Sequence, residues 1–127
     1  MSSQRREDAK SVVNKCYKIH TTLGPGLFES VYEEVLNYEL CKEGFYVERQ
    51  KPLPVIWDDI KLNLGFRIDL MIERQLIIEL KSVQDICAVH KKQVLTYLRL
   101  TGLKLGLLIN FNEALIKHGI QRIVNGL

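Results

Sequence analysis

Three charged side chains interrupt two segments that otherwise alternate like buried strands. Asp69 lies in the segment at 66–72, and Glu79 and Lys81 lie in the segment at 76–81. Because side chains alternate along a strand, Glu79 and Lys81 project from one face, and pairing through a short turn brings Asp69 near Glu79. Buried charges need compensation. A hard divalent cation such as Mg²⁺, which prefers oxygen ligands, would provide it.

A simpler interpretation uses the same residues. Glu79 with Lys81, and Asp69 with Arg67, would be solvated charges on the outer face of a half-exposed sheet. Residue types alone leave both interpretations open.

Hydrophobic periodicity predicts the elements that position these residues. Helices are expected at 12–23, 29–42 and 86–100, and strands at 45–50, 53–57, 60–64, 66–72, 76–81 and 105–110. The two segments before residue 58 are either short strands or one edge strand interrupted by prolines, and residues 115–124 form a helical turn or a last strand. The order α-α-β-β-β-β-α-β predicts an α/β fold, a single domain with a central mixed β-sheet flanked by helices.

Length and composition agree with one globular domain. The chain has 127 residues, of which 46% are hydrophobic, and we expect a polar N-terminal extension at 1–10 followed by the domain at 11–127. No apolar run approaches the ~18 residues that cross a bilayer, and the polar N-terminus lacks the apolar stretch of a secretory signal. The three cysteines form no metal-binding or disulfide pattern. We therefore expect a cytoplasmic protein with no membrane partner.

The charge is distributed unevenly along the chain. Residues 1–63 carry 9 Lys and Arg against 10 Asp and Glu, whereas residues 64–127 carry 9 against 5. The second half therefore holds the positive excess, which favours a surface that faces phosphates.

Two further patterns resemble a known family. Nine residues separate Asp69 from Glu79-x-Lys81, which is the spacing of the metal site in the PD-(D/E)XK nucleases. The string at 26–32, Gly-Leu-Phe-Glu-Ser-Val-Tyr, is similar to the G-x-x-E-x-x-Y string that names the GxxExxY family, small bacterial and archaeal proteins within that superfamily. Similar strings at 19–20, 23–26, 78–81, 95–98 and 109–112 extend the resemblance from about residue 12 to residue 124. The residue before Asp69 is Ile68, where the superfamily pattern has proline.

The resemblance implies a restriction-endonuclease-like fold and a role for each matching residue. Asp69 and Glu79 would be metal ligands together with the carbonyl oxygen of Leu80, the cation being Mg²⁺ or Mn²⁺. Glu29 matches an accessory carboxylate that completes the metal site or relays to it. Lys81 would orient the attacking water or help to deprotonate it, and would steady the charge on the scissile phosphate. Because adjacent carboxylates raise the pKa of a lysine, we favour an electrostatic clamp over a general base.

The helix after these strands carries candidate substrate-binding residues. Gln93 and Tyr97 match a Q-x-x-x-Y string found in helicase-associated and CRISPR-associated nucleases, and they share one helix face. Tyr97 as a core residue is an equal alternative. Lys91 and Lys92 are candidate phosphate contacts or an ordinary solvated face. Glu29 has an alternative role too, as a first-turn acid that meets the helix dipole.

The sequence therefore predicts Mg²⁺-dependent hydrolysis of nucleic acid, with DNA favoured. The alternative is a non-catalytic module that keeps the fold and binds nucleic acid or protein, as a subunit of a repair or defence complex. A homodimer would enlarge the footprint of so small a chain.

Overall fold

The computed structural model describes residues 2–127 as three helices, seven strands and one 3-10 turn. The helices are α1 (Ser2–Leu23), α2 (Glu29–Lys42) and α3 (Ala88–Thr101), and the 3-10 turn η1 is Ile116–His118. The strands are β1 (Val47–Pro52), β2 (Val55–Trp57), β3 (Ile60–Leu62), β4 (Arg67–Ile72), β5 (Leu76–Lys81), β6 (Leu105–Asn110) and β7 (Ile120–Val124).

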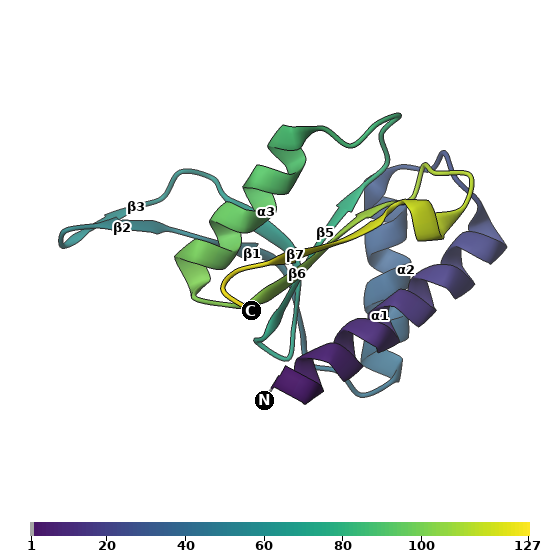
Figure 1. Cartoon of the computed structure of the whole chain (residues 1–127), viewed down its shortest axis with the longest axis horizontal. Coiled ribbons are helices and arrows are strands. Elements are labelled where there is room, and N and C mark those ends of the chain that lie inside the picture. Colours follow the sequence, from purple (N-terminus) through teal and green to yellow (C-terminus); the bar gives the residue numbers. More distant parts are fainter. Residues whose placement is uncertain (1) are drawn as a thin grey trace.

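Five strands form one mixed sheet in the order β1-β4-β5-β6-β7. β5 and β6 run parallel and are joined by α3, and every other neighbouring pair is antiparallel. Helices α1 and α2 cover one face of the sheet and α3 covers the other (Figure 1). The predicted single α/β domain with a central mixed sheet flanked by helices is confirmed.

Alternate residues of the central strands divide between two apolar layers. Leu70 and Ile78 pack with α1 and α2, whereas Ile77 packs with Val94 of α3. On the α3 side the helix lies so close to β6 that a Cβ at Gly106 would be 2.8 Å from Cγ1 of Val94. The absent side chain at Gly106 thus sets how closely α3 approaches the sheet.

The first helix begins earlier than its apolar stripe predicted. It starts at Ser2, and Ala9 is fully buried in the same layer as Cys16, two helical turns later. Asp8 is also buried, and its carboxylate accepts a hydrogen bond from the Gln4 amide at 2.8 Å. The expected boundary between residues 10 and 11 therefore lies inside α1.

The segments on either side of residue 58 do not extend the sheet. β2 and β3 pair only with each other, as a hairpin that projects from the body of the protein (Figure 1). Of the two alternatives for residues 45–57, two separate strands are present, so five strands precede α3 and not the four of the predicted order. The chain leaves the main sheet after β1 and returns at β4. Both alternatives for the tail occur in succession, since η1 is followed by β7.

Within residues 2–127, none of the helices has both the length and the apolar character needed to cross a bilayer. Of the three cysteines, Cys16 is buried and Cys41 and Cys87 are exposed, and all three are free thiols.

Candidate active site at the fork between two strands

The two central strands β4 and β5 separate near the middle of the sheet. Their paired register ends at Leu70 and Ile78. Beyond that point β4 stays paired with β1 as far as Arg67, and β5 stays paired with β6 as far as Lys81. The strands therefore form a fork, with backbone groups of both inner edges free to meet side chains.

Asp69 and Glu79 are the first residues inside the fork, and their carboxylates close its apex. The backbone N–H of Asp69 donates a hydrogen bond to Oε1 of Glu79 at 3.1 Å. The backbone N–H of Leu80 donates to Oδ2 of Asp69 at 2.9 Å. Each carboxylate thus accepts a backbone N–H of the other strand, in the place of a carbonyl oxygen. These two hydrogen bonds hold both carboxylates where regular pairing between the strands has ended. The predicted proximity of Asp69 and Glu79 is present in the structure.

Burial and a like charge make Glu79 a weak acid. The residue is only 3% exposed. Desolvation, and then the negative charge of Asp69, raise the pKa of Glu79 to about 8, while the nearby Lys81 ammonium acts in the opposite direction. Near neutral pH the fork therefore favours one negative carboxylate, that of Asp69, beside a Glu79 that keeps its proton.

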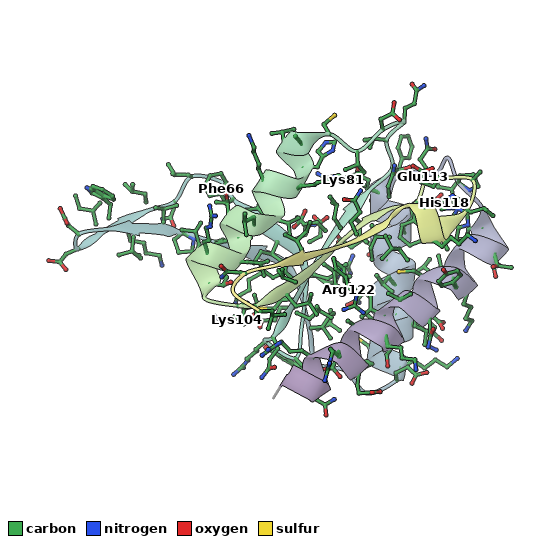
Figure 2. All side chains as sticks on the ribbon, viewed as in Figure 1. Phe66, Lys81, Lys104, Glu113, His118 and Arg122 are labelled. Carbon is green, nitrogen blue, oxygen red and sulfur yellow. The ribbon has the colours of Figure 1, made fainter. Side chains whose placement is uncertain are left out.

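Lys81 is the last residue of β5, two residues after Glu79. It is half-buried and lies opposite Asn110 in the parallel pair with β6, and Figure 2 labels it at this end of the strand. Its carbonyl accepts a hydrogen bond from the Phe111 N–H at 2.9 Å. The Lys81 backbone is therefore held in place. The positive charge of its side chain acts to lower the pKa of Glu79, as expected for two residues that project from the same face of a strand.

A glutamine that the sequence analysis missed joins the fork to α2. Nε2 of Gln50 donates to Oε1 of Glu33 at 2.6 Å and lies 3.2 Å from Oδ1 of Asp69, to which it also donates. Gln50 adopts a φ of +46°, a left-handed conformation that costs energy for any residue with a side chain. Such strain persists where surrounding contacts hold it, and here those contacts aim the amide at Asp69.

Glu33 is a second residue that the sequence analysis missed. It is buried on α2, and Arg49 bridges it to Glu34, with Nη2 at 3.2 Å from Glu33 and 2.9 Å from Glu34. The sequence contained one signal, because Glu33 lies four residues after Glu29 on the same helix face. For Gln50 there was none, since its role depends on a backbone conformation set by tertiary contacts.

The side chain of Glu29, the first residue of α2, contacts the backbone just beyond the end of β5. It does not join the pair formed by Asp69 and Glu79. Its Oε2 accepts a hydrogen bond from the backbone N–H of Ser82 at 3.2 Å. The Ser82 hydroxyl in turn donates to the carbonyl of Leu27 at 2.6 Å. Within residues 2–127, no three acidic, histidine or cysteine side chains are close enough together to hold a metal ion. The structure therefore brings Asp69 and Glu79 together and leaves Glu29 beside the residue that follows Lys81.

The loop before α2 is held in place by Tyr32. The Tyr32 hydroxyl donates to the Gly24 carbonyl at 2.6 Å and accepts from the Leu27 N–H at 3.1 Å, and its ring stacks on Phe111 at 4.3 Å between centroids. Gly26 has a φ of +93°, which favours glycine. The glycine, glutamate and tyrosine of the string at 26–32 thus shape one loop and attach it to the end of β5.

Of the four predicted substrate-binding residues, Tyr97 lies near the carboxylates of the fork and Gln93 lies beside Tyr97. Tyr97 of α3 is buried, and desolvation followed by the charge of Glu79 raises the pKa of its hydroxyl, while hydrogen bonds from the Arg67 backbone and then from the Gln93 side chain act in the opposite direction. Tyr97 is therefore both a core residue and a neighbour of the two carboxylates. Lys91 and Lys92 are exposed on α3.

Two histidines that flank these elements have structural roles. Nδ1 of His90 accepts the Cys87 N–H at 3.0 Å, which caps the start of α3. Nε2 of His20 lies 2.7 Å from the carbonyl oxygen of Glu113 and joins α1 to the loop after β6.

A family model described as the PD-(D/E)XK nuclease superfamily matches residues 6–123. The matched range contains every residue of the fork and both helices that flank it. No curated protein and no solved structure gives a significant match.

Proposed function

Because the chain belongs to the PD-(D/E)XK nuclease superfamily, we propose that it hydrolyses phosphodiester bonds of nucleic acid, with DNA as the favoured substrate and Mg²⁺ or Mn²⁺ as the cofactor. The observation that carries this proposal is the pair of facing carboxylates at the fork, Asp69 and Glu79. Glu79 is buried and Asp69 is half-buried. Removing the proton from Glu79 places two negative charges side by side, which is unfavourable until a positive charge reaches them.

The oxygen atoms at the fork suit a hard divalent cation. Asp69 and Glu79 supply carboxylate oxygens, and the Leu80 carbonyl is a further candidate ligand on the same strand. Desolvation and the Asp69 charge, which together raise the pKa of Glu79, are the two effects that a bound cation would offset. When bound, such a cation supplies charge neutralisation at the phosphate and makes water more acidic. Glu29 is a candidate for an accessory role, in which it fixes the end of β5 through Ser82.

The chain's own residues then position the substrate. The Lys81 ammonium lies near Glu79 and would hold the scissile phosphate, which stabilises negative charge as it develops there. Tyr97, which lies near the same carboxylates, and Gln93 beside it on α3 would contact the phosphate or sugar on that side. Lys91 and Lys92, exposed on the same helix, would contact phosphates farther along the nucleic-acid chain.

The experiment measures degradation of labelled single- and double-stranded DNA and RNA, each in Mg²⁺, Mn²⁺ or EDTA. We expect cleavage with a divalent cation, none in EDTA, and loss of cleavage in Glu79→Gln and Asp69→Asn. The matched control is Glu7→Gln, which makes the same change at an exposed position on α1. We expect this control to cleave like the original protein.

Two results would change the assignment. Binding of nucleic acid without cleavage in either cation would support the alternative of a non-catalytic module. Cleavage that persists in both fork variants would show that the Asp69–Glu79 pair is not the active site.

A further inference from the structure

The hairpin of β2 and β3 is an arm with one apolar face. The arm, residues 54–64, projects from the body of the protein (Figure 1). Its register pairs Val55 with Leu62 and Trp57 with Ile60. Because directly paired residues lie on the same face of a hairpin and positions two apart share that face, these four apolar side chains form one continuous surface.

Most of that apolar surface is open to solvent, since Val55 alone of the four residues is partly buried. Trp57 is 69% exposed and Ile60 is 59% exposed. A two-stranded hairpin by itself is at best marginally stable in water, and this one has only three paired positions. Clustered apolar side chains on a projecting element are typical of interaction surfaces.

The charges of the arm differ between its tip and its root. Asp58 and Asp59 form the turn at the tip. At the root, Arg67 is exposed, and it lines a groove of about 260 Å³ together with apolar residues. The other residues that line this groove are Pro52, Leu53, Pro54, Asn63, Leu64, Gly65 and Phe66, and Figure 2 labels Phe66 at this junction.

We propose that the arm joins two copies of this chain in a two-fold symmetric dimer, independently of the proposed nuclease function. The apolar faces of the two arms stack in opposite directions, so that the tip of each arm reaches the root of the other. Trp57 is then covered, and the Asp58 and Asp59 carboxylates meet the partner's Arg67. Because a two-fold axis repeats each contact, one tip-to-root match provides two.

The charge of the arm favours a protein partner over nucleic acid. Residues 54–64 carry two carboxylates and one ammonium, that of Lys61, so the arm has a net negative charge. Phosphates would be repelled from its tip. A second copy of the chain offers a matching apolar face, and its Arg67 lies at the root of the arm, where the tip of the first arm would reach it.

The backbone conformation at the tip suits an aspartate. Asp58 has a φ of +53° at the first turn position of a two-residue hairpin, where glycine is the favoured residue. Aspartate is one of the few residues with a side chain that adopt this conformation readily. In the proposed dimer, that carboxylate is used at the partner's Arg67.

The test is the mass of the full chain by sedimentation equilibrium, from low micromolar to near-millimolar concentration. We expect about twice the 14.7 kDa mass of the chain. Trp57→Ala should weaken dimerisation on the order of 10- to 100-fold, because burial of a large apolar side chain is lost. The matched control is Tyr38→Ala, at an aromatic residue of α2 that is 63% exposed and lies outside the arm. It should leave the dimer unchanged.

A charge exchange tests the tip-to-root contact specifically. Asp59→Arg and Arg67→Glu should each weaken the dimer, and the double variant should restore part of it, because positions 59 and 67 then again carry opposite charges while Asp58 is unchanged. Circular dichroism confirms that each variant is folded.

Three results would overturn the proposal. The first is a monomer at every concentration, and the second is a dimer that Trp57→Ala does not weaken. The third is a monomer whose affinity for DNA falls in Trp57→Ala, which would assign the arm to nucleic acid.

Discussion

Asp69 and Glu79 each bind the backbone of the other's strand. The Asp69 N–H donates to the Glu79 carboxylate at 3.1 Å, and the Asp69 carboxylate accepts from the N–H next to Glu79 at 2.9 Å. The two side chains therefore replace the ladder where β4 and β5 separate. A change to either residue alters both the charge of the fork and the spacing of its strands.

The raised pKa of Glu79 makes stability depend on pH. Because the pKa of Glu79 is about 8 in the folded protein and 4.5 in the reference state, the folded state retains a proton that the unfolded state loses between these values. This contribution to stability is fully present below pH 4.5 and is lost as pH rises to about 8, at up to about 1.4 kcal/mol per pH unit. In EDTA, urea unfolding from pH 5 to 8 should show this loss.

Glu79→Gln should remove that pH dependence. An amide has no proton to lose, so the variant should be more stable than the original protein at pH 8 in EDTA, by at least about 1 kcal/mol. Glu7→Gln should keep the original slope. Equal slopes in the original protein and in Glu79→Gln would contradict the assigned pKa.

Divalent cations should stabilise the folded protein through the same two carboxylates. Binding to the folded state alone raises its stability by mass action, by about 2.7 kcal/mol at a concentration 100 times the dissociation constant. In thermal unfolding, Mg²⁺ or Mn²⁺ should raise the Tm of the original protein and of Glu7→Gln. Glu79→Gln and Asp69→Asn should respond much less, and an equal response in all four proteins would place cation binding elsewhere.

Two substitutions of Gln50 separate the energetic cost of its backbone conformation from the role of its side-chain amide. Gln50→Gly relieves the cost of φ +46°, whereas Gln50→Ala retains it. Both variants lose the hydrogen bonds to Glu33 and Asp69. The glycine variant should be about 1 kcal/mol more stable than the alanine variant, and both should lose nuclease activity by a similar factor, on the order of 10-fold. Unfolding and cleavage rates are measured together, and full activity in either variant would remove Gln50 from the site.

Tyr32→Phe should loosen the loop before α2 while keeping the ring stacked on Phe111. The variant leaves the Gly24 carbonyl and the Leu27 N–H without their partner. The expected loss is about 1–3 kcal/mol in the free energy of unfolding, with faster amide exchange at 24–28. A variant as stable as the original protein would show that water replaces the hydroxyl.

Lys91 and Lys92 should contribute to binding through phosphates alone. Replacing both with alanine should reduce the slope of log affinity for DNA against log salt by about one to two units. Lys42→Ala, at an exposed position on α2, should leave the slope unchanged. An unchanged slope in the double variant would exclude both lysines from the interface.

The sequence alone determined the features that depend on neighbouring residues. Helix α2 and strands β5 and β6 have the bounds that periodicity predicted, because an apolar pattern with clear turn signals at each end specifies its element locally. The pairing of Asp69 with Glu79 followed too, since a short turn fixes the register of the two strands that it joins.

Only the tertiary structure decided what depends on distant segments. The pKa of Glu79 is set by burial and by a charge on another strand. Gln50 reaches both Glu33 and Asp69 through a left-handed backbone that no local pattern favours. The arm alternates like any strand, and its sequence pattern does not show whether it joins the sheet. The physical reason is common to all three, because burial, strain and strand partners are properties of contacts made after the chain has folded.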